Sequence, residues 1–318
     1  MKILLATDGS KGSLAAARFL RRLQFPTPLQ LTLLTVSQDP QRAGNDAAQP
    51  WYPKWVQRQE DYVDGHHADL ESMLQPDCES IQRVRRHGHA ARVIIDQAKE
   101  DGSDLVVMGA QGHAMIDRMI LGSVSDSVAT HAGCSVLVVR PPRGSEVAED
   151  GFEEAEPGGA SKQGQPPDDS PLRKLTIAYD GSKASVEAVN EIAAMKWSED
   201  TEVTLLSVAP IYDFMMGDGL SAVAMESEQA VCDTLKDTVD EVCSRLKSEF
   251  PNLAGRVEKG RHVGDTIVDI SDTRASELVV VGDAGHGVLH DWILGSTTKY
   301  VLRHAGSSVW ISRRHRSQ

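Results

Sequence analysis

The chain has 318 residues, a formal net charge of −13, 40% apolar residues and 25% charged residues. The length suggests about two domains of ~150 residues each, and the composition is that of an ordinary globular protein. The acidic balance argues against nucleic acid or an anionic membrane as a partner. No apolar run approaches the ~20 residues that cross a bilayer. The first residues are typical of a strand rather than of a signal peptide, so we expect a cytoplasmic protein.

Short apolar runs alternate with helical patterns along the first half of the chain. Helices are expected over 13–23, 54–74, 90–100 and 123–131, and strands over 2–7, 30–36, 80–86, 105–108 and 135–140. Strands that alternate with helices in this way are typical of a parallel sheet covered on both faces. The sequence therefore predicts a doubly wound α/β fold.

The second half repeats the first. Asp8-Gly9-Ser10 returns as Asp180-Gly181-Ser182, and His131-Ala132-Gly133 returns as His304-Ala305-Gly306. The offset drifts by a single residue over more than a hundred positions, which indicates a tandem duplication. The second half is expected to have a long helix from Ser221 to Phe250 and strands near 175–179, 202–208, 255–259, 278–281 and 307–312.

A polar segment joins the two copies. Residues 141–172 hold eight acidic and two basic residues, many Gly and Pro and few large apolar side chains. Such a composition predicts a disordered, self-repelling linker. We therefore expect domains at 1–141 and 173–315, separated by an acidic linker at 142–172.

A glycine motif follows the fourth strand of each copy. After an apolar run, each copy has a G-x-x-G pair, then nine residues, then Gly-Ser. The motif residues are Gly109, Gly112, Gly122 and Ser123 in the first copy and Gly282, Gly285, Gly295 and Ser296 in the second. Glycines let a backbone approach an oxyanion closely, and a helix start offers unpaired N–H groups and a positive dipole end. The motif predicts a phosphate site in each copy, with Ser123 and Ser296 able to cap the helix and to donate to phosphate. The alternative is a pair of βα turns with helix caps and no ligand.

Other polar residues give weaker signals. His113 and His286 follow the second glycine of each motif and could approach a phosphate, although exposed loop histidines are the plainer interpretation. His66-His67 and the basic stretch from Arg83 to His89 lack metal-ligand company, so we expect solvated surface there. The four cysteines show no pairing pattern and are expected to be reduced thiols.

These residues resemble the universal stress protein family, and both copies match along most of their length. The nucleotide-binding members of that family carry the same glycine motif and an acid at the end of strand 1. The resemblance implies two tandem five-stranded parallel, Rossmann-like domains of the adenine nucleotide alpha hydrolase type. It also implies that the two copies pair within one chain through their fifth strands, 135–140 and 307–312, as an intrachain pseudo-dimer.

The resemblance further implies an adenine nucleotide, ATP, which Mg²⁺ can accompany, in each copy. It places an acid near the adenosine, at Asp8 and Asp180, and a backbone contact to adenine at Val36 and Val208. The implied ribose and phosphate contacts are Met108, Gly109, Gly112, Gly122, Ser123 and Val124, and in the second copy Val281, Gly282, Gly285, Gly295, Ser296 and Thr297. No other metal site and no catalytic residue is expected.

Three functions stay open on the sequence. The first is an ATP-binding module that acts as a nucleotide-dependent stress-response regulator. The second is a slow ATPase or an autophosphorylating protein that uses the same pocket, although no P-loop or other catalytic motif is present. The third is a nucleotide-free dimeric scaffold, and further homodimerisation is compatible with each function. A dinucleotide-dependent oxidoreductase is disfavoured because the G-x-G-x-x-G fingerprint is missing after the first strand.

The two copies differ in charge around the motif. Arg118 corresponds to Asp291, and Asp126 corresponds to Lys299. A charge at an exposed helix start changes anion affinity by up to ~1 kcal/mol. The two swaps oppose each other, so the sequence predicts unequal sites without ranking them.

Overall fold

The computed structural model describes residues 1–37, 51–112, 121–141, 170–211, 218–284 and 294–313, with side chains from 229 onward in the helix that begins at Asp218. The first half contains β1 (Lys2–Ala6), α1 (Lys11–Arg22), β2 (Leu29–Ser37), α2 (Tyr52–Leu74), β3 (Cys78–His87), α3 (Ala90–Asp101), β4 (Leu105–Gly109), α4 (Ser123–His131) and β5 (Ser135–Val139). The second half contains β6 (Lys174–Ala178), α5 (Lys183–Ala193), β7 (Glu202–Pro210), α6 (Asp218–Arg245), β8 (Asn252–Gly260), α7 (Val263–Thr273), β9 (Leu278–Gly282), α8 (Ser296–His304) and β10 (Ser308–Ser312).

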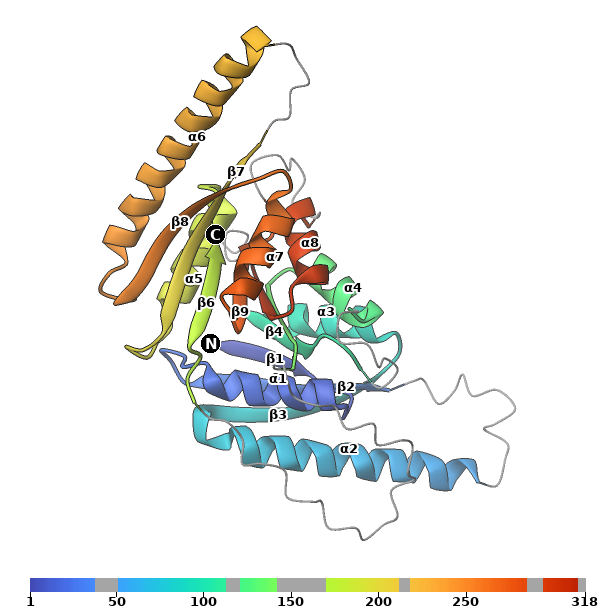
Figure 1. The fold of residues 1–318 in the computed structure, drawn as a ribbon. Coiled ribbons are helices and arrows are strands. Elements are labelled where there is room, and N and C mark those ends of the chain that lie inside the picture. Colours follow the sequence, from blue (N-terminus) through green and yellow to red (C-terminus); the bar gives the residue numbers. More distant parts are fainter. Residues whose placement is uncertain (38–50, 113–120, 142–169, 212–217, 285–293, 314–318) are drawn as a thin grey trace.

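All the strands belong to one ten-stranded sheet, in the order β3-β2-β1-β4-β5-β10-β9-β6-β7-β8 (Figure 1). Strands within each half pair in parallel, and β5 and β10 pair antiparallel where the halves meet. The predicted intrachain pseudo-dimer through the fifth strands is therefore confirmed. Each of these two strands covers the edge of the other. An apolar edge strand left unpaired would be free to pair with another chain.

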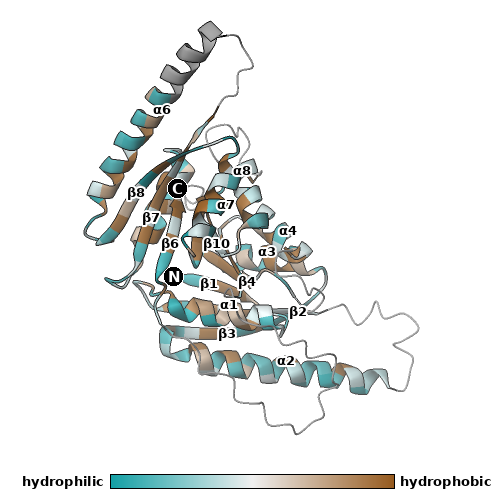
Figure 2. Ribbon diagram, in the orientation of Figure 1, coloured by the Kyte–Doolittle hydropathy of each residue, from teal (hydrophilic) through white to brown (hydrophobic). Residues whose placement is uncertain are grey.

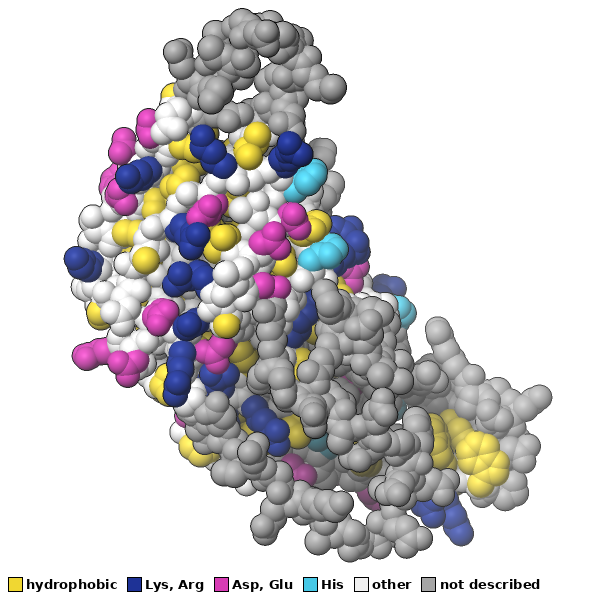
Figure 3. All heavy atoms as spheres, viewed as in Figure 1, with side chains coloured by type: hydrophobic (Ala, Val, Ile, Leu, Met, Phe, Trp, Pro, Cys, Tyr) yellow, Lys and Arg dark blue, Asp and Glu magenta, His cyan; other side chains and the backbone are white. Residues whose placement is uncertain are grey.

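Alternation along the strands divides the core between the two faces of the sheet. Ile3 and Leu5 pack with α1, α2, α5 and α6 on one face, and Leu4 and Ala6 pack with α3, α4, α7 and α8 on the other. Hydrophilic residues predominate on α2 and on the described part of α6 (Figure 2), although Trp55, Tyr62 and Val231 are exposed there. Acidic and basic side chains are interspersed on the face seen in Figure 3. In the described part of the chain, no helix has the length and apolarity that crossing a membrane requires.

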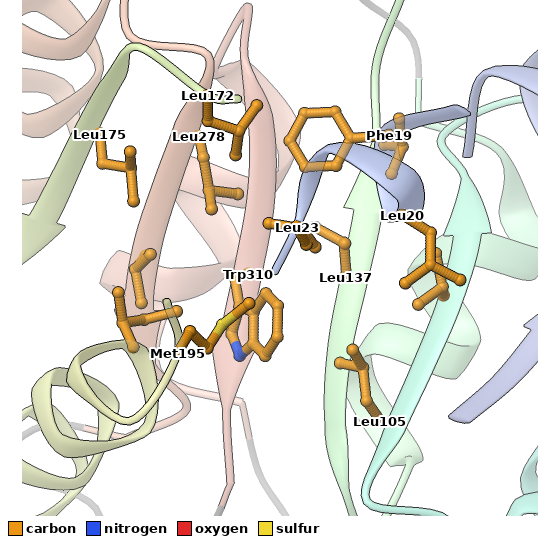
Figure 4. Close-up of a cluster of buried hydrophobic side chains, with 14 of the residues drawn as sticks. Phe19, Leu20, Leu23, Leu105, Leu137, Leu172, Leu175, Met195, Leu278 and Trp310 are labelled. Atoms are coloured by element: carbon orange, nitrogen blue, oxygen red, sulfur yellow. The ribbon is translucent and has the colours of Figure 1, made fainter. Parts of the chain in front are cut away.

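The core continues across the junction between the halves (Figure 4). Trp310 on β10 is 1% exposed and lies opposite Leu137 of β5 in the register. Leu23 of the first half and Met195 of the second lie near the indole. An antiparallel bridge between Gln24 and Lys196 joins the ends of α1 and α5. Because this core is shared, the two halves form one packed body.

Two of the predicted boundaries that differ from the structure involve buried side chains. Helix α6 ends at Arg245 rather than at Phe250, because the chain turns there and buries Phe250 beside Trp197, with ring centroids 6.1 Å apart. The last residues of the predicted linker contact the fold: Leu172 is 1% exposed, and the Ser170 carbonyl accepts a hydrogen bond from Arg22 Nε at 2.9 Å. Residues 142–169 of the predicted linker lie outside the described residues.

Candidate functional site

Each half has a cavity at the carboxyl ends of its strands, between β1 and β4 or between β6 and β9. These are the points where the strand order reverses and where open α/β sheets bind ligands. The volumes are about 300 Å³ in the first half and about 400 Å³ in the second. Every predicted site residue of the first half lines its cavity, from Asp8 and Val36 to Ser123 and Val124. In the second half all of them line the cavity except Gly285, which lies outside the described residues.

The Asp-Gly-Ser segment after the first strand forms the same turn in both halves. Asp8 Oδ1 accepts a hydrogen bond from the Ser10 amide at 3.0 Å, and Gly9 between them has φ +79°, a conformation that favours glycine. Ser10 then caps α1, because its Oγ accepts from the Ser13 amide at 3.2 Å. Asp180 and Ser182 make the matching contacts at α5. The segment therefore has a complete structural explanation in addition to its place in the cavity wall.

The start of α4 is capped differently. Its N-cap is Gly122, which has no side chain, and its first helical residue is Ser123. In α8 the corresponding residues are Gly295 and Ser296. The prediction that Ser123 and Ser296 cap these helices is therefore wrong. The first intrahelical bonds come from the Asp126 and Lys299 amides, so the N–H groups at 123–125 and 296–298 have no carbonyl partner within their helices.

The glycine loop is fastened to the helix that follows it. The Gly122 amide donates to the Ala110 carbonyl at 2.8 Å, and Ser125 Oγ donates to the Gly109 carbonyl at 2.8 Å. In the second half the Gly295 amide and Thr298 Oγ1 make the equivalent bonds at 2.7 Å and 2.6 Å. These bonds hold each uncapped helix start against its cavity.

Packing explains the first glycine of each motif. A Cβ at Gly109 would lie 2.6 Å from the Gly12 backbone, and one at Gly282 would lie 2.8 Å from the Ala184 backbone. Both positions need glycine because α1 or α5 passes so closely. Gly112 differs, since a Cβ there would lie 2.5 Å from Asp8 Oδ2 in the cavity wall. Of these positions, Gly112 is the one at which a side chain would reach another cavity-lining group.

His66 of α2 contacts Thr7, which lines the first cavity. Ser13 Oγ donates to the Ser10 carbonyl, and Thr7 Oγ1 donates to Ser13 Oγ at 3.0 Å. The one hydroxyl proton of Thr7 is thus used, so His66 Nε2, 2.6 Å from Thr7 Oγ1, must donate to it. In this arrangement His66 is not a base for Thr7. Tyr179 stands at the position of Thr7 in the second half.

The expectation that His66-His67 is solvated surface is wrong. His67 is 1% exposed, and its Nε2 lies 2.8 Å from Thr35 Oγ1. Burial lowers the pKa of His67 from its usual 6.5 to about 4, and the nearby His66, Arg83 and Arg85 act in the same direction. Nothing in the sequence signals this burial, because His67 lies within a long polar helix and packing decides which face of that helix meets the sheet.

His67 should make the protein less stable in mild acid. In the unfolded chain it takes up a proton near pH 6.5, whereas the folded protein keeps it neutral down to about pH 4, so stability is lost as the pH falls through this window. The loss from His67 should reach about 2 kcal/mol at pH 5. Urea unfolding at pH 7 and pH 5 should show that His67→Val, the residue at this position in the second half, weakens the pH dependence by that amount. His87→Gln, at an exposed histidine, should leave it unchanged, and an undiminished dependence in His67→Val would contradict the assignment.

Of the charge differences expected around the cavities, the structure describes the one between Asp126 and Lys299. Arg118, Asp291, His113 and His286 lie outside the described residues. Asp126, in the first turn of α4, forms a two-oxygen ion pair with Arg303 of α8, with Nη2 3.1 Å from each oxygen. The position that matches Arg303 in the first half is Thr130. An arginine of the second half therefore offsets the acid beside the first cavity.

Two buried arginines lie at the junction between the halves, and neither was predicted from the sequence. Arg313, just after β10, lies 3.5 Å from Asp283 of the second glycine loop, and both side chains are 0% exposed. Arg313 Nη2 also donates to the Ala129 carbonyl of α4, and Nη1 donates to the Cys134 carbonyl. Arg140 occupies the matching place after β5. An acid inside a glycine motif and a basic residue at a strand end are the only sequence signals of this pair.

Comparison with known proteins agrees with the α/β architecture of the two halves. The model of the universal stress protein family matches residues 1–140 and 171–313. With most of both halves covered, this chain belongs to the universal stress protein family.

Individual relatives share about 30% of their residues with this chain over the matched regions. A universal stress protein of Mycobacterium tuberculosis is 31% identical over 212 residues, which cover 66% of this chain and 62% of the relative. The matched region thus spans less than two thirds of that relative's length. A universal stress protein of Methanocaldococcus jannaschii is 29% identical over 144 residues, covering 45% of this chain and 83% of the relative.

Solved structures share the whole fold. A universal stress protein from Archaeoglobus fulgidus superposes with a TM-score of 0.59 at 15% identity, covering 98% of this chain and 96% of its own. A Pseudomonas aeruginosa protein described as a putative universal stress protein gives a TM-score of 0.58 at 16% identity, covering 99% and 95%. At such identities the likeness concerns the fold alone.

Proposed function

We propose that each half binds one adenine nucleotide, ATP in the first instance, and that the protein is a nucleotide-dependent regulator or binding module of the stress response. The single observation that carries the proposal is the uncapped start of α4 and of α8 beside a cavity at the strand-order reversal. Helices α1 and α5 reach the same cavities, but their own serines cap them. Helices α3 and α7 also begin at the cavities without a side-chain cap, at Ala90 and Val263. Helices α4 and α8 are the ones whose free N–H groups follow the glycine motif, where the backbone can approach an anion closely.

The residues present fit such a ligand. The amides at 123–125 and 296–298 would hold phosphate oxygens, and the hydroxyls of Ser123 and Ser296 could add hydrogen bonds. Asp8 and Asp180 line the cavities at the ends of β1 and β6, where a carboxylate can accept from a ribose hydroxyl. Apolar residues such as Val36, Ile94 and Met108 supply a surface for the base. Mg²⁺ would accompany the phosphates and reduce their charge repulsion.

The direct test is the small-molecule content of the purified protein. Denaturing the protein and weighing the released molecules by mass spectrometry should give an adenine nucleotide. Titration calorimetry on the stripped protein should give two sites per chain. Protein that neither carries nor takes up any nucleotide would overturn the proposal and favour the scaffold function.

Ser123→Pro should weaken anion binding in the first half without disturbing α4. Proline is compatible with the first helical position, and Gly122 before it has φ −65° and ψ 148°, which a residue before proline can adopt. The change deletes one N–H of the proposed phosphate site, so we expect about a tenfold loss of ATP affinity there, about 1.4 kcal/mol. Calorimetry should show this loss, whereas Ser123→Ala, which keeps the N–H group, should change the affinity less.

Ser296→Pro is the matched variant in the second half, where Gly295 has φ −57° and ψ 149°. Together the two variants measure each site separately and test our proposal that the sites are unequal. The Asp126–Arg303 pair reduces the repulsion that Asp126 would exert on an anion in the first half. Lys299 occupies the matching place in the second half, so we propose that the second site is the tighter one. Equal dissociation constants for the two sites would contradict this ranking.

Slow hydrolysis or autophosphorylation in the same cavities is a separate outcome. Phosphate release that disappears in Gly122→Val would assign turnover to the first site, and release that survives in all cavity variants would indicate a contaminating enzyme. A cytoplasmic location and any further homodimer remain predictions from the sequence and from the family resemblance.

A further inference from the structure

Arg140 and Arg313 are matching residues that reach across the junction between the halves. Arg140 Nη2 donates to the Leu302 carbonyl of α8 at 2.8 Å, just as Arg313 Nη2 donates to the Ala129 carbonyl of α4. Their backbone amides also match, since Arg140 N donates to Ser308 Oγ at 3.2 Å and Arg313 N donates to Ser135 Oγ at 3.0 Å. The duplication thus gives two copies of one environment, which can be compared atom by atom.

The copies differ in the residue beside the guanidinium. In the second half this residue is Asp283, whose buried carboxylate lies 3.5 Å from Arg313 Nε. In the first half the matching residue is Ala110. Its amide donates to the Val139 carbonyl at 2.8 Å, which places it next to Arg140 across the ends of β4 and β5. A methyl group stands where the second half has a carboxylate, so the side chain at 110 cannot balance the charge.

Arg140 is 5% exposed, and its Nε and Nη1 have no hydrogen-bond partner among the described residues. Within the same residues no carboxylate forms an ion pair with it. Asp272 of α7 acts on it only through space, and burial lowers the pKa of Arg140 to about 10. The guanidinium therefore stays charged at neutral pH. Charged donors that are buried without an acceptor are costly, and native proteins satisfy them with a protein group, an ion or water.

We propose that the first half binds a small inorganic anion, of the size of chloride, against Nε and Nη1 of Arg140, in the place that the Asp283 carboxylate takes in the second half. The bound ion would supply the negative charge that Asp283 supplies in the second half. This site is separate from the two cavities, because neither Arg140 nor Ala110 lines them. The inference does not depend on nucleotide binding.

Thermal unfolding of the full chain at constant ionic strength tests the site, with chloride exchanged for gluconate, which is too large to be buried there. Raising chloride from zero to about 200 mM should raise the melting temperature by about 3 °C. Ala110→Asp supplies the missing carboxylate and should raise the melting temperature in chloride-free buffer while abolishing most of the response. Arg140→Met removes the cation and should also lose the response, so the test stands even where the aspartate variant fails to fold.

Crystals grown in bromide give a direct readout, because bromide scatters anomalously. A peak in contact with Arg140 Nε and Nη1, and no peak beside Arg313, would support the proposal. Equal chloride responses in the wild type and in Arg140→Met would overturn it. So would density at Arg140 that fits water and gives no bromide peak.

Discussion

Arg313→Met is expected to lower the free energy of unfolding by about 3–5 kcal/mol, the usual cost of breaking a buried ion pair by removing one partner. The substitution leaves Asp283 charged and fully buried, and it removes the donors to the Ala129 and Cys134 carbonyls. Because those donors join β10 to α4, the loss should loosen the junction as well as the second glycine loop. Urea unfolding should show an earlier midpoint.

Two variants separate the ion pair from general damage to the junction. Asp283→Ala added to Arg313→Met makes the second half resemble the first at this position, and it should recover more than half of the loss because the buried carboxylate that Arg313 contacts is gone as well. Arg140→Met in chloride-free buffer removes a matching arginine that has no ion-pair partner in the described part of the chain, so it should cost only about 1–2 kcal/mol. Equal losses in Arg140→Met and Arg313→Met would show that Asp283 contributes little.

Gly112→Val should lower ATP affinity in the first half by about 100-fold or more, which corresponds to about 2.7 kcal/mol. The new Cβ would lie 2.5 Å from Asp8 Oδ2, so the carboxylate must move and the branched side chain must occupy the edge of the cavity. Calorimetry should then find one site per chain instead of two. The remaining site should keep the affinity of the second half.

Gly133→Val is the control for Gly112→Val. A Cβ at Gly133 would meet nothing within 4 Å, and the residue is exposed after the end of α4. It should therefore retain both sites. Two sites of unchanged affinity in Gly112→Val would show that the first glycine loop does not border the ligand, and would count against the proposed function in that half.

Much of the fold could be predicted because its signals are local. Alternating strand and helix patterns predicted the strands, and the 172-residue offset of Asp8-Gly9-Ser10 predicted the duplication. The structure gathers the predicted site residues it describes around two cavities, since all of them fall at strand ends or at the start of the following helix. Whether they bind a nucleotide stays a prediction until it is measured.

The predictions that were wrong concern features that depend on contacts between distant segments. Ser123 was expected to cap α4, but the cap is set by the backbone at Gly122, which the Ala110 carbonyl holds in place. His67 was expected at the surface, yet α2 turns it inward onto Thr35. A pattern of residues identifies a helix, but packing decides which of its polar residues face the sheet.

The α/β class, the tandem duplication and the positions of the two glycine motifs could be predicted from the amino-acid sequence alone, because hydrophobic periodicity and turn residues act over a few residues. The folded chain was needed to show that passing helices require glycine at positions 109 and 282. It was also needed to show that Asp283 meets Arg313, whereas Ala110 supplies no counter-charge to Arg140. Those pairings are made across neighbouring strands and across the junction of the halves. They arise from close packing between segments that lie far apart in the chain.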